Sequence, residues 1–354
     1  MRLRVNRFDR GSKAAPLWLH AALALAAVSA LLVVAAGCGG GEEASGAAGG
    51  EKKVSLVAYS TPREAYEEII PAFRETADGS GVEFEQSYAS SGEQSRAVEA
   101  GLDADVVAFS LAPDVARLVD AGLVAEDWDK DEHDGMVTDS VVVFVVREGN
   151  PENIQTWDDL LREGVEVITP NPFTSGGAKW NIMAAYGAQL EQGKSEEEAI
   201  EYLRELFIEH VPVQDKSARE SLQTFAAGKG DVLLAYENEA IFAQQQGQPL
   251  EYVVPGETIL IENPVAVVSS SSDKQAAQAF IDYLRTPEAQ RVFGEKGYRP
   301  VVEDVFAEFD YPEPDGLFPI DDVGGWDEVN TRFFDREESI FADIENELGV
   351  PTDG

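Results

Sequence analysis

The chain has little sulfur, little histidine and little positive charge. Its 354 residues include one cysteine, three histidines and three methionines, and 27 Lys and Arg residues stand against 66 Asp and Glu residues. A single cysteine excludes a disulfide scaffold, and so few histidines leave little material for a soft-metal site. The formal net charge of -39 argues against binding of nucleic acid, because phosphate recognition needs a basic face.

The length and the hydrophobic content suffice for two cores. Hydrophobic residue types make up 44% of the chain, which supports two cores of about 100–150 residues each. This argues against a single small module and against a disordered tail.

The first forty residues differ from the rest and resemble a bacterial lipoprotein signal. Five basic residues lie from Arg2 to Lys13, an apolar run covers residues 14–37, and small residues lead directly into Cys38. We therefore predict a signal peptide over 1–37, acylation of Cys38, a flexible tether over 38–51, and an extracytoplasmic location on the outer face of the cell membrane. The alternative is a retained transmembrane anchor, because the apolar run is nearly long enough to span a bilayer.

Cleavage before Cys38 would make the chain more acidic still. It removes five basic residues and one acidic residue, so that 22 basic and 65 acidic residues remain, with a formal charge of -43. Such a surface repels anions at long range. Any anion site must therefore depend on short-range hydrogen-bond donors.

Short β-branched runs alternate with helical stretches from Lys52 onward. The expected strands cover residues 54–59, 82–86, 105–109, 141–147, 165–169, 231–236 and 265–268, and the expected helices include residues 63–76, 178–192, 196–207 and 275–285. Strands that alternate with helices of this length form parallel sheets with crossover helices, so the predicted fold class is α/β.

Four of the expected helices begin with a small hydroxyl-bearing turn directly after a strand. These turns contain Thr61; Ser90 and Ser91; Ser175, ahead of Gly176 and Gly177; and Ser217, ahead of Ala218. Helix amino ends carry unpaired N–H groups and partial positive charge, and ligands of open α/β sheets bind beyond the carboxyl ends of the strands. Taken singly, each turn is an ordinary helix cap, but together they would form a neutral cage of donors for an anion.

The sequence contains no recognisable catalytic apparatus. It has no Gly-x-Ser-x-Gly turn and no phosphate loop, and the serine-rich turns lack a partnered histidine. We therefore expect no enzymatic activity, no cofactor and no metal site. Glu237 and Glu239 are interpreted as residues of a helix start or of lobe closure, and Arg219 as the nearest cation, which pairs with an acid or shields the cage without touching the anion.

Several stretches resemble the periplasmic sulfate-binding proteins of ABC importers. They occur in consistent order between about Val54 and Trp326, and they cover residues 62–64, 86–94, 146–151, 168–180, 231–239 and 298–300. The most specific of them reads Ile-Thr-Pro-Asn-Pro-Phe-Thr-Ser-Gly-Gly-Ala-Lys-Trp over residues 168–180.

The resemblance implies a two-lobed periplasmic-binding-protein fold of type II, in which each lobe is a mostly parallel sheet flanked by helices. We expect lobe 1 to comprise residues 52–137 and 264–300, and lobe 2 residues 138–263. Residues 301–354 would pack across the lobes. The function implied is that of an ABC importer's solute-binding component, which closes by a hinge and presents sulfate to the permease and ATPase subunits.

The resemblance also implies the donors that hold the anion. They are Ser60, Ser91, Ser175, Gly176, Gly177, Ala218 and Tyr236, with Arg219 behind them. Ser60 stands where the family has an aspartate, and Tyr236 where it has a tryptophan. Sulfate has no proton near neutral pH and suits a cage of donors, whereas the proton of phosphate would face a donor. Thiosulfate, molybdate and phosphate are the alternative ligands.

Overall fold

The computed structural model describes residues 52–352, all of which lie in one compact unit of the chain, Gly49–Gly354. The predicted signal peptide, the lipidation site Cys38 and the tether lie outside the described residues. Among the described residues, no helix has the length and apolar character needed to cross a membrane.

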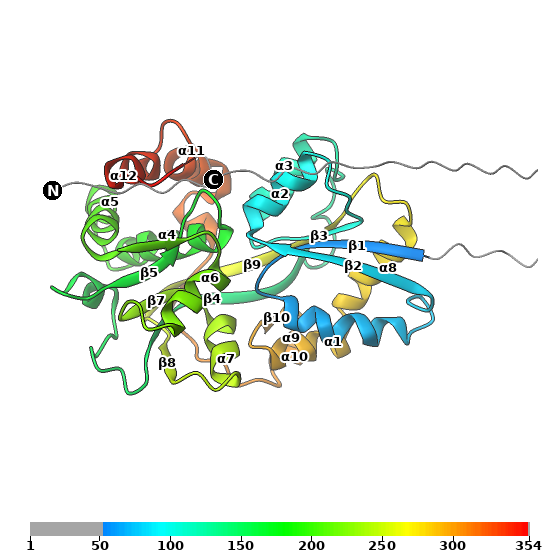
Figure 1. The fold of residues 1–354 in the computed structure, drawn as a ribbon, viewed down its shortest axis with the longest axis horizontal. Coiled ribbons are helices and arrows are strands. Elements are labelled where there is room, and N and C mark those ends of the chain that lie inside the picture. The colour runs from blue at the N-terminus through cyan, green and yellow to red at the C-terminus, as the bar shows by residue number, and fades with distance from the viewer. Residues whose placement is uncertain (1–51, 353–354) are drawn as a thin grey trace, which may run out of the picture. The chain divides into compact units, whose positions relative to one another are not determined.

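Eleven strands form one curled sheet around two central antiparallel strands. The two are β4 (Met136–Arg147) and β9 (Glu257–Val267). The order of the main path is β2-β1-β3-β9-β4-β7-β5-β6. Figure 1 shows β4 and β9 running through the middle, with a group of strands at each end.

Each group contains parallel strands, as the sequence predicted. On one side β1 (Lys52–Tyr59) pairs in parallel with β2 (Val82–Ala89) and with β3 (Val106–Ala108). On the other side β5 (Val167–Pro170) pairs in parallel with β6 (Val213–Asp215) and with β7 (Val232–Tyr236). Three short strands pair with the two central strands: β8 (Leu250–Val253) and β10 (Arg299–Pro300) are antiparallel to β4, and β11 (Gly316–Phe318) is parallel to β9.

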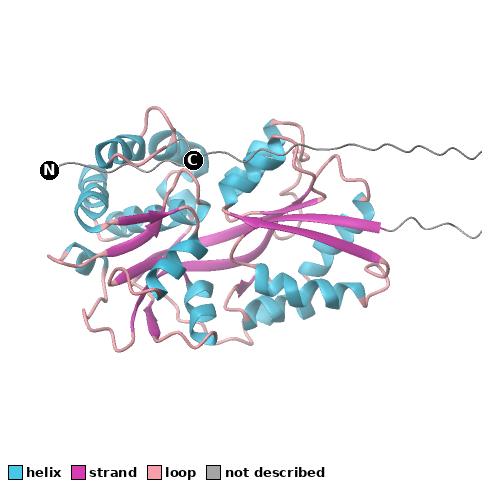
Figure 2. Cartoon of the chain, in the orientation of Figure 1, coloured by secondary structure: helices cyan, strands magenta, loops and turns pink. Residues whose placement is uncertain are grey.

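Helices flank the sheet (Figure 2). They are α1 (Arg63–Arg74), α2 (Ser91–Glu99), α3 (Ala112–Asp120), α4 (Gly176–Glu191), α5 (Glu196–Glu205), α6 (Ala218–Ala226), α7 (Glu237–Gln245), α8 (Lys274–Leu284), α9 (Pro287–Glu295), α10 (Glu303–Phe306), α11 (Gly325–Phe334) and α12 (Ile340–Leu348). The α/β fold class is therefore confirmed. The predicted strands all appear, and β6 is the strand expected before the turn at Ser217. β8, β10 and β11 were not predicted because two to four residues carry almost no periodic pattern.

The hydrophobic core consists of separate clusters, which lie at the two groups of parallel strands. Leu56, Ile69 and Phe280 belong to one buried cluster at the β1 side, whereas Phe144 and Phe207 belong to another at the β5 side. Side-chain burial of this kind provides most of the driving force for folding. The lobe boundaries themselves remain a prediction.

The C-terminal helices α11 and α12 pack against α4 and the π-helical turn Leu206–His210. The rings of Tyr186 and Phe333 lie 4.9 Å apart at their centroids, and those of Phe207 and Phe341 lie 4.8 Å apart. Figure 1 shows α11 and α12 above α4 and α5. This segment contributes its aromatic side chains to the second core rather than forming one of its own.

Candidate functional site

A small cavity lies where six helices begin. The residues that line it come from the turns before α1, α3 and α7 and from the first residues or caps of α2, α4 and α6. They are Tyr59, Ser60, Thr61, Ser90, Ser91, Ser110, Ser175, Gly177, Ser217, Ala218 and Tyr236. None of these side chains carries a charge. The cavity is therefore a neutral enclosure at the positive ends of several helix dipoles.

The cavity contains six of the seven residues predicted to bind a ligand. They are Ser60, Ser91, Ser175, Gly177, Ala218 and Tyr236. The seventh, Gly176, is not among the lining residues. It lies beside the cavity, where a Cβ atom would collide with the side chains of Ser110 and Leu111 at the start of α3.

Gly177 fixes how closely three helix starts approach one another. A Cβ atom built at Gly177 would lie 3.5 Å from the Cβ of Ala218, 3.5 Å from Oγ of Ser175 and 3.6 Å from Cε1 of Tyr236. The absence of a side chain therefore leaves the space that α4, α6 and α7 surround. The first N–H groups of these helices have no partner within their own helix and remain available to a ligand.

Three buried hydroxyl groups of the cavity have no hydrogen-bond partner within residues 52–352. They belong to Tyr59, Ser110 and Tyr236, whose exposed fractions are 5%, 1% and 1%. Leaving a buried hydroxyl unpaired costs about 1–3 kcal/mol, so the three hydroxyls need a hydrogen-bond partner from outside the chain, either water or a ligand. Burial raises the pKa of both tyrosines, so both keep their protons and remain donors.

The hydroxyl of Ser91 is already engaged. It donates to Oδ2 of Asp114 at 2.6 Å and accepts from the backbone N–H of Ser110 at 3.0 Å. Because the hydroxyl holds α2 against α3, only the backbone N–H at the start of α2 is available to the cavity.

Arg219 does not line the cavity, although it follows Ala218 directly. Its guanidinium donates to both carboxylate oxygens of Glu64, at 2.7 and 3.0 Å, and to both oxygens of Glu239, at 3.1 and 2.9 Å. A further bond of 3.1 Å reaches the carbonyl of Thr61. Burial lowers the pKa of Arg219, but the charge of Glu239 and the bonds to Glu64 outweigh it and raise the pKa above its ordinary value. The predicted pairing with an acid is therefore observed.

The two glutamates near the site both form ion pairs with arginines outside the cavity. Oε2 of Glu237 accepts from Nε of Arg299 at 2.8 Å, and the two side chains are almost completely buried. Glu239 pairs with Arg219. Neither glutamate lines the cavity, so no carboxylate acceptor faces a bound anion there.

Two lining residues, Tyr59 and Ser110, were not identified from the sequence, while Thr61, Ser90 and Ser217 were named only as residues of the turns that form the expected cage. Ser110 had a usable signal, because it directly follows a predicted strand, like the serine-containing turns that were identified. Thr61 bonds the hydroxyl of Tyr298 at 2.9 Å, and Oγ of Ser217 accepts from the backbone N–H of Glu220, so both also support the turns that carry the donors.

No metal centre accompanies the cavity in the part of the chain that the structure describes. There, no three His, Cys, Asp or Glu residues gather in a way that could hold a metal ion. His210, for example, places Nδ1 3.0 Å from the carbonyl of Val165.

Comparison with known proteins decides the family. Residues 54–299 match the family model described as bacterial extracellular solute-binding protein. The chain belongs to this family. The chain is 42% identical over 295 residues to a sulfate-binding protein of Synechococcus elongatus, which covers 80% of this chain and 83% of the relative. It is 38% identical to the sulfate-binding protein of Escherichia coli, over 78% of this chain and 88% of the relative.

A thiosulfate-binding protein of Pseudomonas aeruginosa is also similar, at 35% identity over 79% of this chain and 88% of the relative. Among solved structures, the sulfate-binding protein SubI of Mycobacterium tuberculosis superposes with a TM-score of 0.78 at 46% identity, over 80% of this chain and 100% of that one. These solute-binding relatives are named for binding, in agreement with the prediction that the chain is not an enzyme.

Proposed function

We propose that this solute-binding protein is the sulfate-binding component of an ABC importer. The observation that carries the proposal is the cavity of neutral donors, in which three unpaired hydroxyls and several helix amino ends surround a space without any charged side chain. The sulfate-binding relatives, at 38% and 42% identity over most of both chains, support the same ligand.

Selectivity would follow from the lack of a carboxylate acceptor in the cavity. Sulfate accepts hydrogen bonds at all four oxygens, whereas hydrogen phosphate must also donate one. Because Glu237 and Glu239 are held by Arg299 and Arg219, no carboxylate is free to accept that proton. The mismatch would cost about 1–3 kcal/mol for a buried pair of donors.

Uptake would involve hinge closure between the two predicted lobes. Ser60 and Ser91 follow strands on the β1 side, while Ser175, Ala218 and Tyr236 follow strands on the β5 side. β4 and β9 connect the sides and would serve as the hinge. An open form would admit the anion, and the closed form would be the one that the permease recognises. Acylation of Cys38 would hold the protein at the membrane.

Thiosulfate is the second candidate ligand. It is favoured by the 35% identity to a thiosulfate-binding protein and by Tyr236, whose phenol replaces the tryptophan of the sulfate-binding family. The sulfur of thiosulfate is larger and a weaker acceptor than oxygen. A site with three hydroxyl donors would therefore hold sulfate more tightly.

Calorimetric titration with sulfate, thiosulfate, molybdate and phosphate tests the assignment. We expect the tightest binding for sulfate and a higher melting temperature in its presence, because a ligand that binds only the folded state stabilises it. No heat and no thermal shift with either sulfur oxyanion would refute the proposal. Tighter binding of thiosulfate would replace the first candidate with the second.

A further inference from the structure

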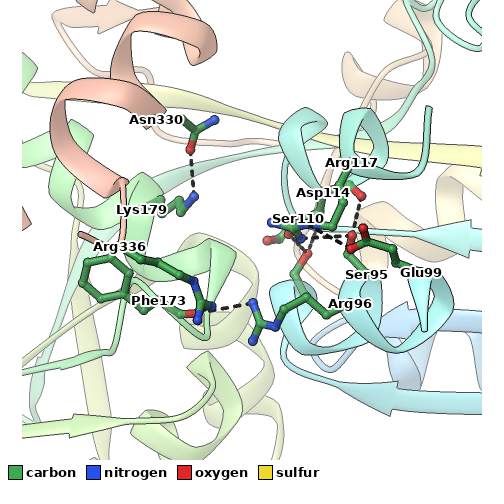
Figure 3. A network of polar contacts seen from close by, with 11 residues as sticks. Ser95, Arg96, Glu99, Ser110, Asp114, Arg117, Phe173, Lys179, Asn330 and Arg336 are labelled. Atoms are coloured by element: carbon green, nitrogen blue, oxygen red, sulfur yellow. Dashed lines mark hydrogen bonds and ion pairs between the residues drawn. The ribbon is translucent and has the colours of Figure 1, made fainter. Parts of the chain in front are cut away.

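A second pocket lies next to the cavity and has the opposite character. It shares Ser175 with the cavity and is bordered by α2, α3, the start of α4 and the segment after α11. Its lining residues are Gly92, Arg96, Asp114, Arg117, Pro172, Phe173, Thr174, Ser175, Gly176, Lys179, Phe334 and Arg336. Figure 3 shows Arg96 and Arg336 approaching each other from opposite sides, with Lys179 directed to Asn330 and Arg117 beside Asp114.

The pocket concentrates positive charge in a strongly acidic chain. Arg96, Arg117, Lys179 and Arg336 line it together with a single carboxylate, that of Asp114. In the whole chain acidic residues outnumber basic ones 66 to 27. The lining of this pocket is therefore net positive, whereas the chain as a whole is strongly negative.

Three of the cations have no carboxylate partner within residues 52–352. Nη1 of Arg96 and Nη2 of Arg336 both donate to the carbonyl of Phe173, at 3.5 and 3.1 Å, and Nζ of Lys179 donates to Oδ1 of Asn330 at 2.7 Å. Only Arg117 pairs with acids, at 3.5 Å from Asp114 and 3.8 Å from Glu99. The positive charge of the pocket is therefore largely uncompensated.

The arrangement is unfavourable without an anion. Nη2 of Arg96 is buried and lacks a partner in the described part of the chain. Burial, and next the charges of Arg336 and Arg117, lower the pKa of Arg96. Burial also lowers the pKa of Lys179 to about 8; Asp114 opposes this, and Arg117, Arg336 and Arg96 add to it. Uncompensated buried charge is costly, and a bound anion would offset that cost.

We propose that this pocket is a second anion site, which binds a small doubly charged oxyanion such as sulfate or hydrogen phosphate. Arginine forks match the oxygens of either anion, and Asp114 can accept the proton of hydrogen phosphate. The pocket therefore accepts phosphate, which the neutral cavity disfavours. The inference does not depend on which oxyanion the neutral cavity holds.

Inorganic phosphate is the probe with which anion binding in the pocket is measured. In calorimetry at low ionic strength we expect the wild-type protein to bind one phosphate, and R96Q/R336Q to bind it at least tenfold more weakly. These substitutions remove repelling charges, so the variant should melt no lower than the wild type. K130Q, which changes an exposed lysine that does not line the pocket, is the control and should bind phosphate as the wild type does.

Sulfate titration of the same proteins separates the two sites. Wild type and K130Q should bind two sulfates, and R96Q/R336Q should keep only the tighter one. Equal phosphate affinity in R96Q/R336Q and wild type would overturn the second site, as would a wild type that binds no phosphate. Retention of one tight sulfate in that case would leave the function proposed for the neutral cavity intact.

Discussion

Arg219 holds Glu64 through two hydrogen bonds of 2.7 and 3.0 Å, although the two residues are 155 positions apart in the sequence. The same guanidinium also binds Glu239, whose side chain is only 1% exposed. One cation thus ties the start of α1 to the starts of α6 and α7, directly behind the cavity. Two carboxylates hold its guanidinium, which does not line the cavity.

Replacement of Arg219 by Gln should be strongly destabilising. It would leave the buried carboxylate of Glu239 unpaired, and loss of one partner of a buried ion pair costs about 3–5 kcal/mol. Thermal or urea unfolding measures the effect. The double variant R219Q/E239Q removes the unpaired charge and should recover a large part of the loss. If R219Q alone unfolds like the wild type, the pair has no structural role.

Replacement of Gly177 by Ala should block the cavity without harming the fold. The added methyl group would lie in ordinary contact with Ala218, Ser175 and Tyr236, inside the space available to the ligand. We expect sulfate affinity to fall at least tenfold, with a melting temperature equal to that of the wild type or higher. G256A is the control, because a Cβ atom at Gly256 meets nothing within 4 Å.

The neighbouring glycine is unsuitable for this experiment. A side chain at Gly176 would collide with Ser110 and Leu111, so that G176D would disturb the packing of α4 on α3 as well as any ligand. Undiminished sulfate affinity in G177A would show that the ligand does not occupy the space beside Gly177.

Replacement of Tyr236 by Phe should weaken ligand binding and leave the stability of the protein unchanged. The phenol is buried and has no partner in the described chain, so its loss removes a donor that only a ligand would use. One such bond contributes about 1–3 kcal/mol, which corresponds to roughly 5- to 150-fold in affinity. Calorimetry with sulfate measures it. Y283F removes another buried, unpaired phenol outside the cavity and should bind sulfate normally.

The central strands should confer a pH dependence through Asp139. It lies opposite Glu262 in the pairing of β4 with β9, and burial, with a further contribution from Glu262, raises its pKa to about 7. Because the folded pKa is above the ordinary 3.8, protonation of Asp139 stabilises the fold, and this stabilisation is lost as the pH rises through 7.

The variant D139N should therefore be more stable than the wild type at pH 8, and this advantage should shrink at pH 6. Melting temperatures of both proteins at the two pH values test it. Glu345, whose pKa burial also raises to about 7, is present in both proteins and cancels in the comparison. An identical difference at pH 6 and pH 8 would show that Asp139 does not titrate in this range.

Local sequence patterns predicted the strands and the helix starts because both depend on neighbouring residues. A β-branched run followed by Ser and Gly specifies a strand and then a helix amino end, and Ser91, Ser175 and Ala218 were found in this way. The resemblance to sulfate-binding proteins added Ser60 and Tyr236, which no local pattern distinguishes.

Tertiary contacts determined what the sequence left open. The hydroxyl of Ser91 binds Asp114, 23 residues away, and no local pattern indicates that pairing. Arg336 approaches Phe173 across 163 positions. The basic pocket was not predicted for the same reason, since its cations are distributed over α2, α3, α4 and the segment after α11, and each one alone is an ordinary surface charge.

Asp114 touches both sites at once. It accepts the hydroxyl of Ser91, which lines the neutral cavity, and it is the one carboxylate of the basic pocket. If both proposed sites bind anions, an anion in the pocket would change the electrostatic field at this carboxylate and hence its hydrogen bond to Ser91 in the first turn of α2. Occupation of the two sites would then be coupled, and the coupling would be reciprocal: the apparent affinity of each site would depend on the concentration of the other site's ligand.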